Sequence, residues 1–533
     1  MKNKNLIFMI CDATTQDNIN FLQSYPATFP GFNKILNNSK IYNNFFACAP
    51  VTEMVLPSIF SGSYPLDQGG YENGMKDKKD SLIKILENNN YDLKILSASS
   101  WLSNIYNYSD NNKTIEHLFS VENAWQSFQK AYLQYIKLNL QENNIELSYV
   151  KEVILKHFNF FKFFIKDDFS FFTKFILGIK KKNHQSVIKN IDFHINQFSN
   201  NPQKYLSENL DNMLKSNFGE FFFKKNISFS LYKMFNKFFW NGKKSEIPNI
   251  FFEKLNFEIR SPSQKMLANK FFEKLELFWL KDEKKSKAIF LHFFDVHDRN
   301  FSSNQIFKYI ADEGKNLTKE IRQEFADDRK LMSLLYVDKL IFNFLNKNKD
   351  KLKNSTLVLT SDHGVTFQNG ESCLNSTSLP GSFHDAYINI PFIVMDNEVK
   401  KEINNNLHSS IDILSIVTKA LKIDKKAEDN FNFNNRKLNI DNDNYVLLEH
   451  CHRGPSSQNL KKGIVYQCLR SIKYKYIYKS KIHPKDPQKN TQEIFIDLIS
   501  DPKEKKNSIN EIKYIEIVNK IREITKNRLN QII

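Results

Sequence analysis

The chain has 533 residues, of which 41% are hydrophobic and 25% charged, and its formal net charge is +17. This length exceeds one ordinary core of ~100–200 residues, so we expect two packed units or one large α/β unit with insertions. The composition is globular, the charge favours anionic partners, and no uncharged stretch approaches the ~20 residues that span a bilayer.

The first apolar run, residues 6–10, is followed almost directly by Asp12, and we interpret it as a buried strand. It is shorter than the ~7–15 apolar residues of a signal peptide, and no A-x-A site follows it. The five cysteines are odd in number and form no CxxC pair, which favours a reducing compartment over a disulfide framework or a structural zinc site. We therefore expect a cytoplasmic protein.

Strands and helices alternate up to residue 118, which indicates a parallel sheet with right-handed crossovers. The expected elements are the strand 6–10, a mostly helical stretch 18–36, the strand 41–46, a helix opening at 56–60, the helix 81–88 and the strand 91–97.

Residues 120–285 are helical in pattern, basic and rich in Phe, and few turn signals interrupt them. We interpret them as a helical insertion that covers the active site or meets a partner. Phe and Lys together also suit peripheral contact with a membrane surface. A helical cap that buries its own Phe faces is the favoured alternative.

The α/β pattern returns after residue 285 and gives way to a meander of strands near residue 440. The expected elements are the strand 288–294, the helix 328–346, the strands 356–360 and 391–395, the helix 410–421, the strands 445–449, 464–470 and 474–478, and a last helix at about 512–529. We predict a catalytic domain over residues 1–440 and a small α+β subdomain over residues 441–533.

Acidic and imidazole side chains follow the predicted strands. Asp12 follows the first strand, and Asp362 and His363 follow the strand 356–360. Ligands of open α/β sheets bind beyond the carboxyl ends of the strands, where Asp and neutral His are suitable ligands for a divalent metal. Asp12 by itself could equally be a helix N-cap.

Two further clusters follow the same logic. Asp295 and His297 lie just past the strand 288–294, and His384 precedes the strand 391–395. His292 lies inside its strand, where the pattern does not determine which face it takes, so it is not among the candidates.

Several segments in the same order resemble the sulfatase family of the alkaline phosphatase superfamily. They include NLIFMICDA at the start, VDKLIFNFLNKNKDKLKNSTLVLTSDHG, SSIDILSIVTKAL, and IFIDLISDPKEKKNSINE near the end, and the similarity covers residues 5–118 and 285–508. The resemblance implies an alkaline-phosphatase-like fold, with a mostly parallel sheet flanked by helices, and an enzyme that binds divalent metal ions.

The family's nucleophile lies ten residues before the Gly of a Thr-Gly or Ser-Gly pair. Here that pair is Ser61-Gly62, so the resemblance implies Thr52 as the nucleophile. Sulfatases that convert Cys or Ser to formylglycine carry C-x-P-S-R at this place. Cys48 lies four residues too early for that motif, so Thr52 is more similar to the threonine of the superfamily's phosphodiesterases and phosphotransferases.

The resemblance implies one metal site formed by Asp12, Thr52, Asp362 and His363. A second set, formed by Asp295, His297 and His384, would bind another ion or the substrate anion. The ions, one or two in number, would be zinc, manganese or calcium.

We predict hydrolysis of phosphate or sulfate esters through a covalent intermediate on Thr52. The substrate would be an anionic small molecule or a glycan or lipid ester, and nucleic acid is not expected. The alternatives are a phosphotransferase that moves a head group from a lipid or sugar donor, and an inactive anion-binding protein.

Overall fold

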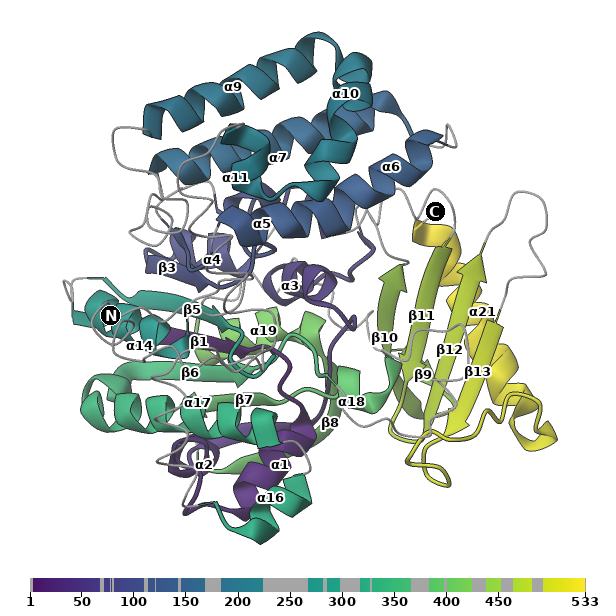
Figure 1. Ribbon diagram of the computed structural model, residues 1–533. Helices are drawn as coiled ribbons and strands as arrows, with labels where there is room; N and C mark the ends of the chain where they lie inside the picture. The colour runs from purple at the N-terminus through teal and green to yellow at the C-terminus, as the bar shows by residue number, and fades with distance from the viewer. Residues whose placement is uncertain are drawn as a thin grey trace.

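The computed structural model describes most of the chain in two β-sheets with their covering helices (Figure 1). The described residues are 3–67, 71–76, 78, 81–109, 114–119, 121–141, 145–167, 184–223, 267–280, 285–297, 317–325, 328–365, 383–396, 400–423, 438–451, 464–481 and 492–532.

The larger sheet has eight strands in the order β4-β3-β5-β1-β6-β7-β2-β8. Its pairs are parallel except where β7 meets β6 and β2. The strands are β1 (Asn5–Cys11), β2 (Ser39–Phe46), β3 (Asp92–Ser97), β4 (Ile115–His117), β5 (Lys287–Phe293), β6 (Ser355–Thr360), β7 (Phe392–Asp396) and β8 (Glu402–Ser409). This mostly parallel sheet confirms the predicted α/β fold class.

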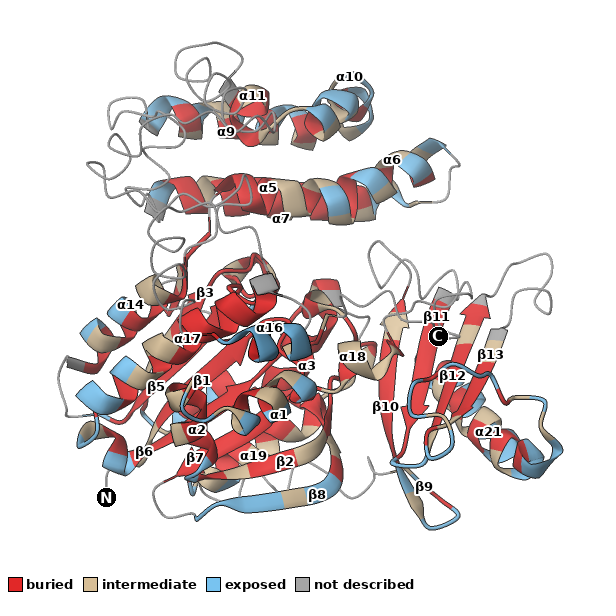
Figure 2. Cartoon of the chain, turned by 60° about the horizontal axis from the view of Figure 1, so that its bottom comes forward, coloured by how far each residue is buried: buried red, intermediate tan, exposed pale blue. Residues whose placement is uncertain are grey.

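The central strand β1 is buried on both faces, as the apolar run predicts. Leu6, Phe8 and Ile10 belong to one hydrophobic cluster, whereas Ile7 and Met9 belong to the cluster on the opposite face. The edge strand β8 is largely exposed (Figure 2). Such two-sided burial is typical of parallel sheets that carry helices on both faces.

Helices cover both faces of this sheet. They are α1 (Gln16–Ser24), α2 (Pro30–Leu36), α3 (Thr52–Ser61), α4 (Leu82–Asn88), α14 (Ala268–Leu280), α16 (Lys319–Phe325), α17 (Asp328–Lys347), α18 (Asp385–Ile388) and α19 (Ile413–Ala420). Short 3-10 turns lie at Tyr71–Asn73, Asn104–Tyr106, Lys351–Asn354 and Ser410–Asp412. The stretch 18–36, predicted as mostly helical, contains two helices, since the chain turns at residues 25–29.

Helices from the predicted insertion form a separate layer, which we call the helical layer (top of Figure 1). It contains α5 (Val121–Phe128), a π-helical turn (Gln129–Leu133), α6 (Gln134–Gln141), α7 (Leu147–Asp167), α9 (His184–Asn200), α10 (Pro202–Lys215) and α11 (Phe218–Phe223). By contrast, α14 packs against β5 and α17 on the main sheet.

The helical layer buries its aromatic side chains within itself. Trp125, for example, is fully buried and its ring lies 5.3 Å from that of Phe221. Among the described residues of the layer, the exposed large apolar side chains are Leu138 and Phe193. Peripheral membrane contact through the Phe-rich segments is therefore not supported. Among the described helices, none is both long enough and apolar enough to cross a membrane.

A second, antiparallel sheet lies beside the first, with the strand order β13-β12-β11-β10-β9. Its strands are β9 (Leu438–Ile440), β10 (Asp443–Cys451), β11 (Ile464–Arg470), β12 (Tyr474–Lys481) and β13 (Gln492–Asp497). A 3-10 turn (Ile512–Tyr514) leads into α21 (Ile515–Ile532), which packs on this sheet. The division of the chain near residue 440 stays a prediction.

Polar contacts tie the second sheet and α21 to the segments on either side of α3. The amide of Glu449 in β10 donates to the carbonyl of Cys48 at 2.8 Å. Arg528 of α21 binds the Glu449 carboxylate at 2.8 Å and the Asp67 carboxylate at 2.8 Å. We call this set the Arg528 brace.

Candidate active site

Three adjacent parallel strands, β5, β1 and β6, end at the same edge of the large sheet. The amide of Asp12 donates to the carbonyl of Phe293 at 3.2 Å, and Ala13 forms an isolated bridge with Gly364. The segments that follow these strands are thus held side by side. This arrangement brings distant polar residues of the sequence into one place.

The segment after β6 is fixed by close packing. The Ser361 hydroxyl donates to the carbonyl of His363 at 2.7 Å and accepts from the amide of Thr14 at 3.2 Å. A Cβ added at Gly364 would lie 2.3 Å from the carbonyl oxygen of Ala386, so only glycine fits there. The loop that carries Asp362 and His363 is therefore pressed against both α18 and the segment after β1.

The side chains at this edge form a buried cluster of carboxylates and imidazoles. His292 Nε2 lies 3.4 Å from Asp12 Oδ2 and 4.0 Å from Asp362 Oδ2. His363 Nε2 lies 3.9 Å from Asp12 Oδ1 and 3.7 Å from Asp362 Oδ2. Asp12, Asp362 and His292 are fully buried.

Two sets of three residues each present ligand atoms that lie within 4.8 Å of one another. One set is Asp12, His297 and His363, and the other is Asp12, His292 and Asp362. Both carboxylate oxygens of Asp12 and one of Asp362 are buried without a hydrogen bond in the described structure. Because an unsatisfied buried carboxylate is costly, this donor set fits a divalent cation.

The imidazoles influence the charge on Asp12. Burial by itself would raise the pKa of its carboxyl group, but His297, His292 and His363 outweigh this effect and lower it below its usual range. Asp12 is therefore a carboxylate at neutral pH. In contrast, burial raises the pKa of the neighbouring Cys11 thiol to about 12, so this side chain is a thiol at neutral pH.

Thr52 is the first residue of α3, and its hydroxyl Oγ1 lies 3.1 Å from His363 Nε2. His363 Nδ1 lies 2.7 Å from the carbonyl oxygen of Gly364, which accepts hydrogen bonds and cannot donate them. Nδ1 therefore carries a proton, and in the neutral ring the Nε2 lone pair faces Thr52. The Thr52 hydroxyl donates to it.

The structure places the predicted residues differently from the two predicted sets. Asp12, Thr52, Asp362 and His363 lie together, and His297 joins Asp12 and His363. Asp295 is fully buried after β5 but belongs to neither set of three. His384 begins α18, where its Nδ1 accepts from the amide of Ala386 at 3.1 Å and its Nε2 lies 3.9 Å from Glu504 Oε1. His384 also belongs to neither set.

Sequence reasoning missed His292, which the structure places directly in the cluster. His292 pairs with Ile10 across β5 and β1, two residues before Asp12. Its position near the carboxyl end of a buried strand could have indicated a site residue. The register between two strands that are far apart in sequence could not be derived.

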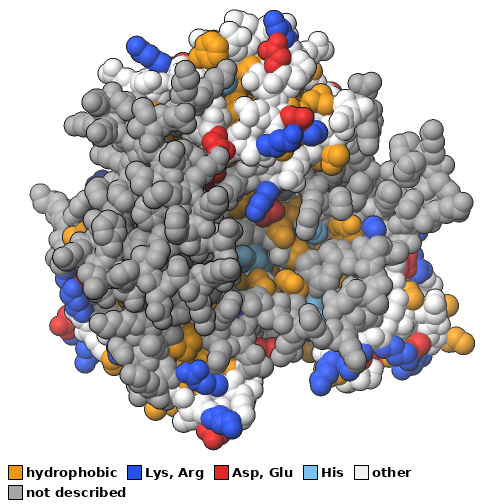
Figure 3. Space-filling view, in the orientation of Figure 1, with side chains coloured by type: hydrophobic (Ala, Val, Ile, Leu, Met, Phe, Trp, Pro, Cys, Tyr) orange, Lys and Arg blue, Asp and Glu red, His pale blue; other side chains and the backbone are white. Residues whose placement is uncertain are grey.

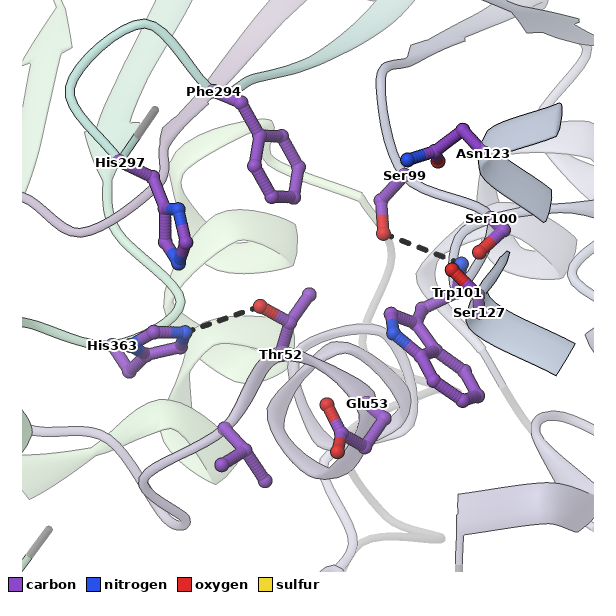
Figure 4. A pocket seen from close by; sticks show the side chains of 11 residues that line it. Thr52, Glu53, Ser99, Ser100, Trp101, Asn123, Ser127, Phe294, His297 and His363 are labelled. Atoms are coloured by element: carbon purple, nitrogen blue, oxygen red, sulfur yellow. Dashed lines mark hydrogen bonds between the residues drawn. The ribbon is translucent and has the colours of Figure 1, made fainter. Parts of the chain in front are cut away.

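A cavity of about 300 Å³ opens beside Thr52. Histidine side chains are visible in the hollow near the centre of Figure 3. In Figure 4, His363 and His297 lie on one side of Thr52 and Trp101 on the other. The remaining lining residues are Val51, Glu53, Ser99, Ser100, Asn123, Ser127 and Phe294. The pKa of the Glu53 carboxyl is raised above its usual value, because the effect of burial exceeds the opposing effect of His363.

The comparisons with known proteins agree with this fold. The family model named Sulfatase matches residues 4–162 and 179–423, which is more than half of the chain. The match continues through most of the predicted insertion, beyond the segments that carried the resemblance. The chain therefore belongs to the sulfatase family. It is an enzyme that hydrolyses sulfuric or phosphoric ester bonds.

Solved structures share the fold over nearly their whole length. A sulfatase from a glycosaminoglycan-metabolising locus of Bacteroides thetaiotaomicron is 13% identical with a TM-score of 0.51, covering 99% of this chain and 100% of its own. A candidate sulfatase of Bacteroides fragilis is 12% identical with a TM-score of 0.51, covering 99% and 96%. Another from Bacteroides thetaiotaomicron is 12% identical with a TM-score of 0.50, covering 100% and 93%. No curated protein sequence matches the chain.

Proposed function

We propose that the chain hydrolyses a phosphate ester, with a sulfate ester as the alternative, through a covalent intermediate on Thr52. The observation that carries this proposal is the hydrogen bond of 3.1 Å between the Thr52 hydroxyl and His363, beside two buried carboxylates and at the wall of a cavity. A hydroxyl held in this way is positioned to attack a tetrahedral phosphorus or sulfur centre in the cavity.

The position of Cys48 supports Thr52 as the nucleophile and disfavours Cys48 as a precursor of formylglycine. Cys48 is fully buried, is not among the residues that line the cavity, and has a thiol pKa that burial raises to about 12. Thr52 itself lines the cavity. The hydroxyl therefore has access to a substrate that the thiol lacks.

The chemical step follows from this placement. The Thr52 oxygen forms a bond to phosphorus, the bond from phosphorus to the leaving oxygen breaks, and the alcohol departs with one proton. Water then cleaves the ester on Thr52 and restores the hydroxyl. His363 Nε2 lies 3.1 Å from the hydroxyl oxygen, which places that oxygen beside the cluster of carboxylates and imidazoles.

We propose that Asp12, Asp362, His363 and Thr52 bind a divalent ion of zinc, manganese or calcium, with His297 and His292 completing the set around Asp12. Such an ion would lower the pKa of the threonine hydroxyl and offset charge on the transferred group. Asp295 and His384 are proposed as outer groups that contact a second ion or the substrate anion.

The test is a substrate panel measured together with metal content. The purified chain is assayed with an aryl phosphate monoester, an aryl phosphate diester and an aryl sulfate, before and after chelation, while bound metal is measured by mass spectrometry. Sulfated and phosphorylated sugars belong in the panel, because one structural neighbour comes from a glycosaminoglycan-metabolising locus. A protein that takes up none of the three metals and cleaves none of these esters would sink the proposal.

The nucleophile is tested with a matched pair of variants. Thr52→Ala removes the attacking oxygen and is expected to lower turnover by about 10⁴-fold. Thr52→Ser keeps the oxygen and is expected to retain most of the activity. In the wild type, a rapid quench should trap a phosphoryl or sulfuryl group on the peptide that contains Thr52. Full turnover by Thr52→Ala would eliminate this assignment.

A further inference from the structure

A buried cluster of opposite charges joins the second sheet to the start of α18. Its members are Arg470 of β11, Lys475 of β12, Asp385 of α18 and Glu504, which follows β13. Lys475 and Glu504 are fully buried, and Arg470 is 8% exposed. None of these four residues has a role in the proposed reaction so far.

The two cations of the cluster lie at an unfavourable place. Arg470 and Lys475 are directly opposite each other in the antiparallel pair of β11 and β12. Like charges at such positions repel each other, and burial removes the water that would screen them. Arg470 donates to the Asp385 carboxylate at 2.8 and 3.2 Å, and Lys475 donates to it at 2.6 Å, which offsets this cost. Since apolar residues often fill such a place at no loss of stability, stability alone does not account for these charges.

Lys475 and Glu504 hold the backbone on both sides of His384. Lys475 Nζ donates to the carbonyl of Phe383 at 2.9 Å, one residue before His384. Glu504 Oε1 accepts from the amide of Asp385 at 2.9 Å, one residue after His384. The two side chains also bind each other, with Lys475 Nζ 2.7 Å from Glu504 Oε2. The main chain at His384 is therefore held by two residues that come much later in the sequence.

The imidazole of His384 is oriented as well as its backbone. Its Nδ1 accepts from the amide of Ala386 at 3.1 Å, so this nitrogen carries no proton. In the neutral ring the proton is then on Nε2, which is a hydrogen-bond donor and lies 3.9 Å from Glu504 Oε1. The side chain is 27% exposed, so it remains accessible to a ligand.

The helix α18 is in direct contact with the loop that carries His363. The amide of Gly364 donates to the carbonyl of Tyr387 at 2.7 Å, and a Cβ added at Gly364 would lie 2.3 Å from the carbonyl oxygen of Ala386. A shift of α18 would therefore displace His384 relative to His363. Misplacement of a group by ~1 Å costs up to about 10²-fold in rate.

We propose that Lys475 and Glu504 are positioning residues, which hold His384 in place as a hydrogen-bond donor to the substrate anion. This inference rests on the proposed function for the role of His384. It gives the second sheet a part in the reaction, because a cation and a carboxylate that touch no substrate determine where this histidine lies.

The first measurement follows the backbone and needs no turnover. Amide hydrogen exchange of the full chain, detected by mass spectrometry, is compared between the wild type and Glu504→Ala. The peptide that contains residues 383–388 should exchange at least about tenfold faster in the variant, because the Asp385 amide loses its buried acceptor. The matched control is Glu493→Ala, which removes the carboxylate partner of Arg522 on the same sheet and should leave this peptide unchanged.

The second measurement determines whether the effect passes through His384. The kcat and KM for the ester identified by the panel, and the dissociation constant of inorganic phosphate, are measured for Glu504→Ala, His384→Ala and the double variant. Glu504→Ala is expected to lower kcat/KM by about 10–100-fold. In the chain that already lacks the His384 ring, the same substitution should cost less than about twofold, whereas a merely structural role would cost the same factor in both chains. Glu493→Ala should keep the kcat and KM of the wild type.

Circular dichroism checks that each variant is folded. If Glu504→Ala does not fold, Glu504→Gln takes its place, since it keeps the shape and one acceptor oxygen and should show the same changes at a smaller size. The inference is overturned if exchange of residues 383–388 is unchanged, or if the losses caused by the Glu504 and His384 substitutions multiply.

The outcomes separate this inference from the proposed function. Cleavage of an ester by a chain in which the two losses multiply would leave the proposed function intact and remove the inference. A chain that cleaves no ester, but whose phosphate affinity shows the non-additive cycle, would contradict the proposed function and support the inference. A chain that neither cleaves an ester nor binds phosphate would contradict both.

Discussion

Histidine has opposite roles in the two main regions of the molecule. At the edge of the large sheet, His292 and His363 face the buried carboxylates of Asp12 and Asp362. In the helical layer, His157 stacks on Phe128 with a centroid distance of 4.2 Å, and its Nδ1 donates to the carbonyl of Val153 at 2.8 Å.

The difference lies in the partners. Carboxylates favour a charged or metal-bound imidazole, whereas aromatic rings and a helix carbonyl favour a neutral one. Burial lowers the pKa of His157 to about 3, which makes the ring a packing residue. The histidines at the sheet edge are thus suited to bind a metal ion or move a proton. His157 in the helical layer instead fills space in an aromatic core. The residue type alone does not distinguish them.

The largest effect is expected when a buried carboxyl group at the sheet edge, Asp12, is compared with one in the helical layer, Glu122. Asp12→Asn removes the carboxylate that both sets of three residues share, so kcat/KM on the ester identified by the panel should fall by about 10⁴-fold, with loss of bound metal. The control is Glu122→Gln in the helical layer, where Glu122 accepts from the amide of Phe218 at 2.9 Å. It should keep its metal content and most of its kcat. Equal losses in both variants would remove the distinction between the regions.

A smaller effect concerns stability in the second sheet, where buried charges pair with each other. Lys475 is fully buried and donates to Glu504 at 2.7 Å and to Asp385 at 2.6 Å. Lys475→Met removes the lysine partner of the buried Glu504 carboxylate, while Asp385 keeps Arg470. It should cost about 3–5 kcal/mol of unfolding free energy, measured by urea denaturation.

The matched exposed pair is Lys520 and Asp441, whose side chains are 51% and 52% exposed. Lys520→Met should cost no more than about 1 kcal/mol, because water screens this pair. Equal losses of unfolding free energy in the two variants would show that burial does not make the Lys475 ion pairs more stabilising than the exposed pair.

The smallest effect is a pH dependence that originates in the helical layer. The unfolded His157 titrates near ~6.5, whereas the folded ring titrates only at about 3, so the unfolded state binds more protons between these values. Stability therefore falls as the pH drops through this window, by about 2 kcal/mol at about pH 5. His157→Phe keeps the stacked ring and should lose this part of the pH dependence in urea unfolding. An unchanged pH dependence would show that the ring does not stay neutral in the folded chain.

The strands and the chemistry at their ends could be predicted because both have local signatures. Residues 6–10, 288–294 and 356–360 are largely apolar runs, which mark buried strands, and Asp or His follows each of them closely. The edge strand β8 was missed because its exposed Asn residues pair through the backbone and leave no apolar pattern.

The cavity could not be predicted for a different reason. Ser99, Trp101 and Asn123 are types that occur in any loop or helix, and only the packing of α5 near the loop after β3 brings them together. His292 shows the same limitation within a strand, since its place depends on the register between β5 and β1.

The Arg528 brace has a consequence for the order in which the enzyme becomes competent during its synthesis. The loop before Thr52 hydrogen-bonds to β10 through Cys48 and Glu449, and Glu449 is held by Arg528. A nascent chain that has already folded its large sheet still lacks this support until residue 528 has left the ribosome tunnel. Thr52, the proposed nucleophile, lies far before Arg528 in the chain, so its loop gains this partner only long after Thr52 itself has been synthesised.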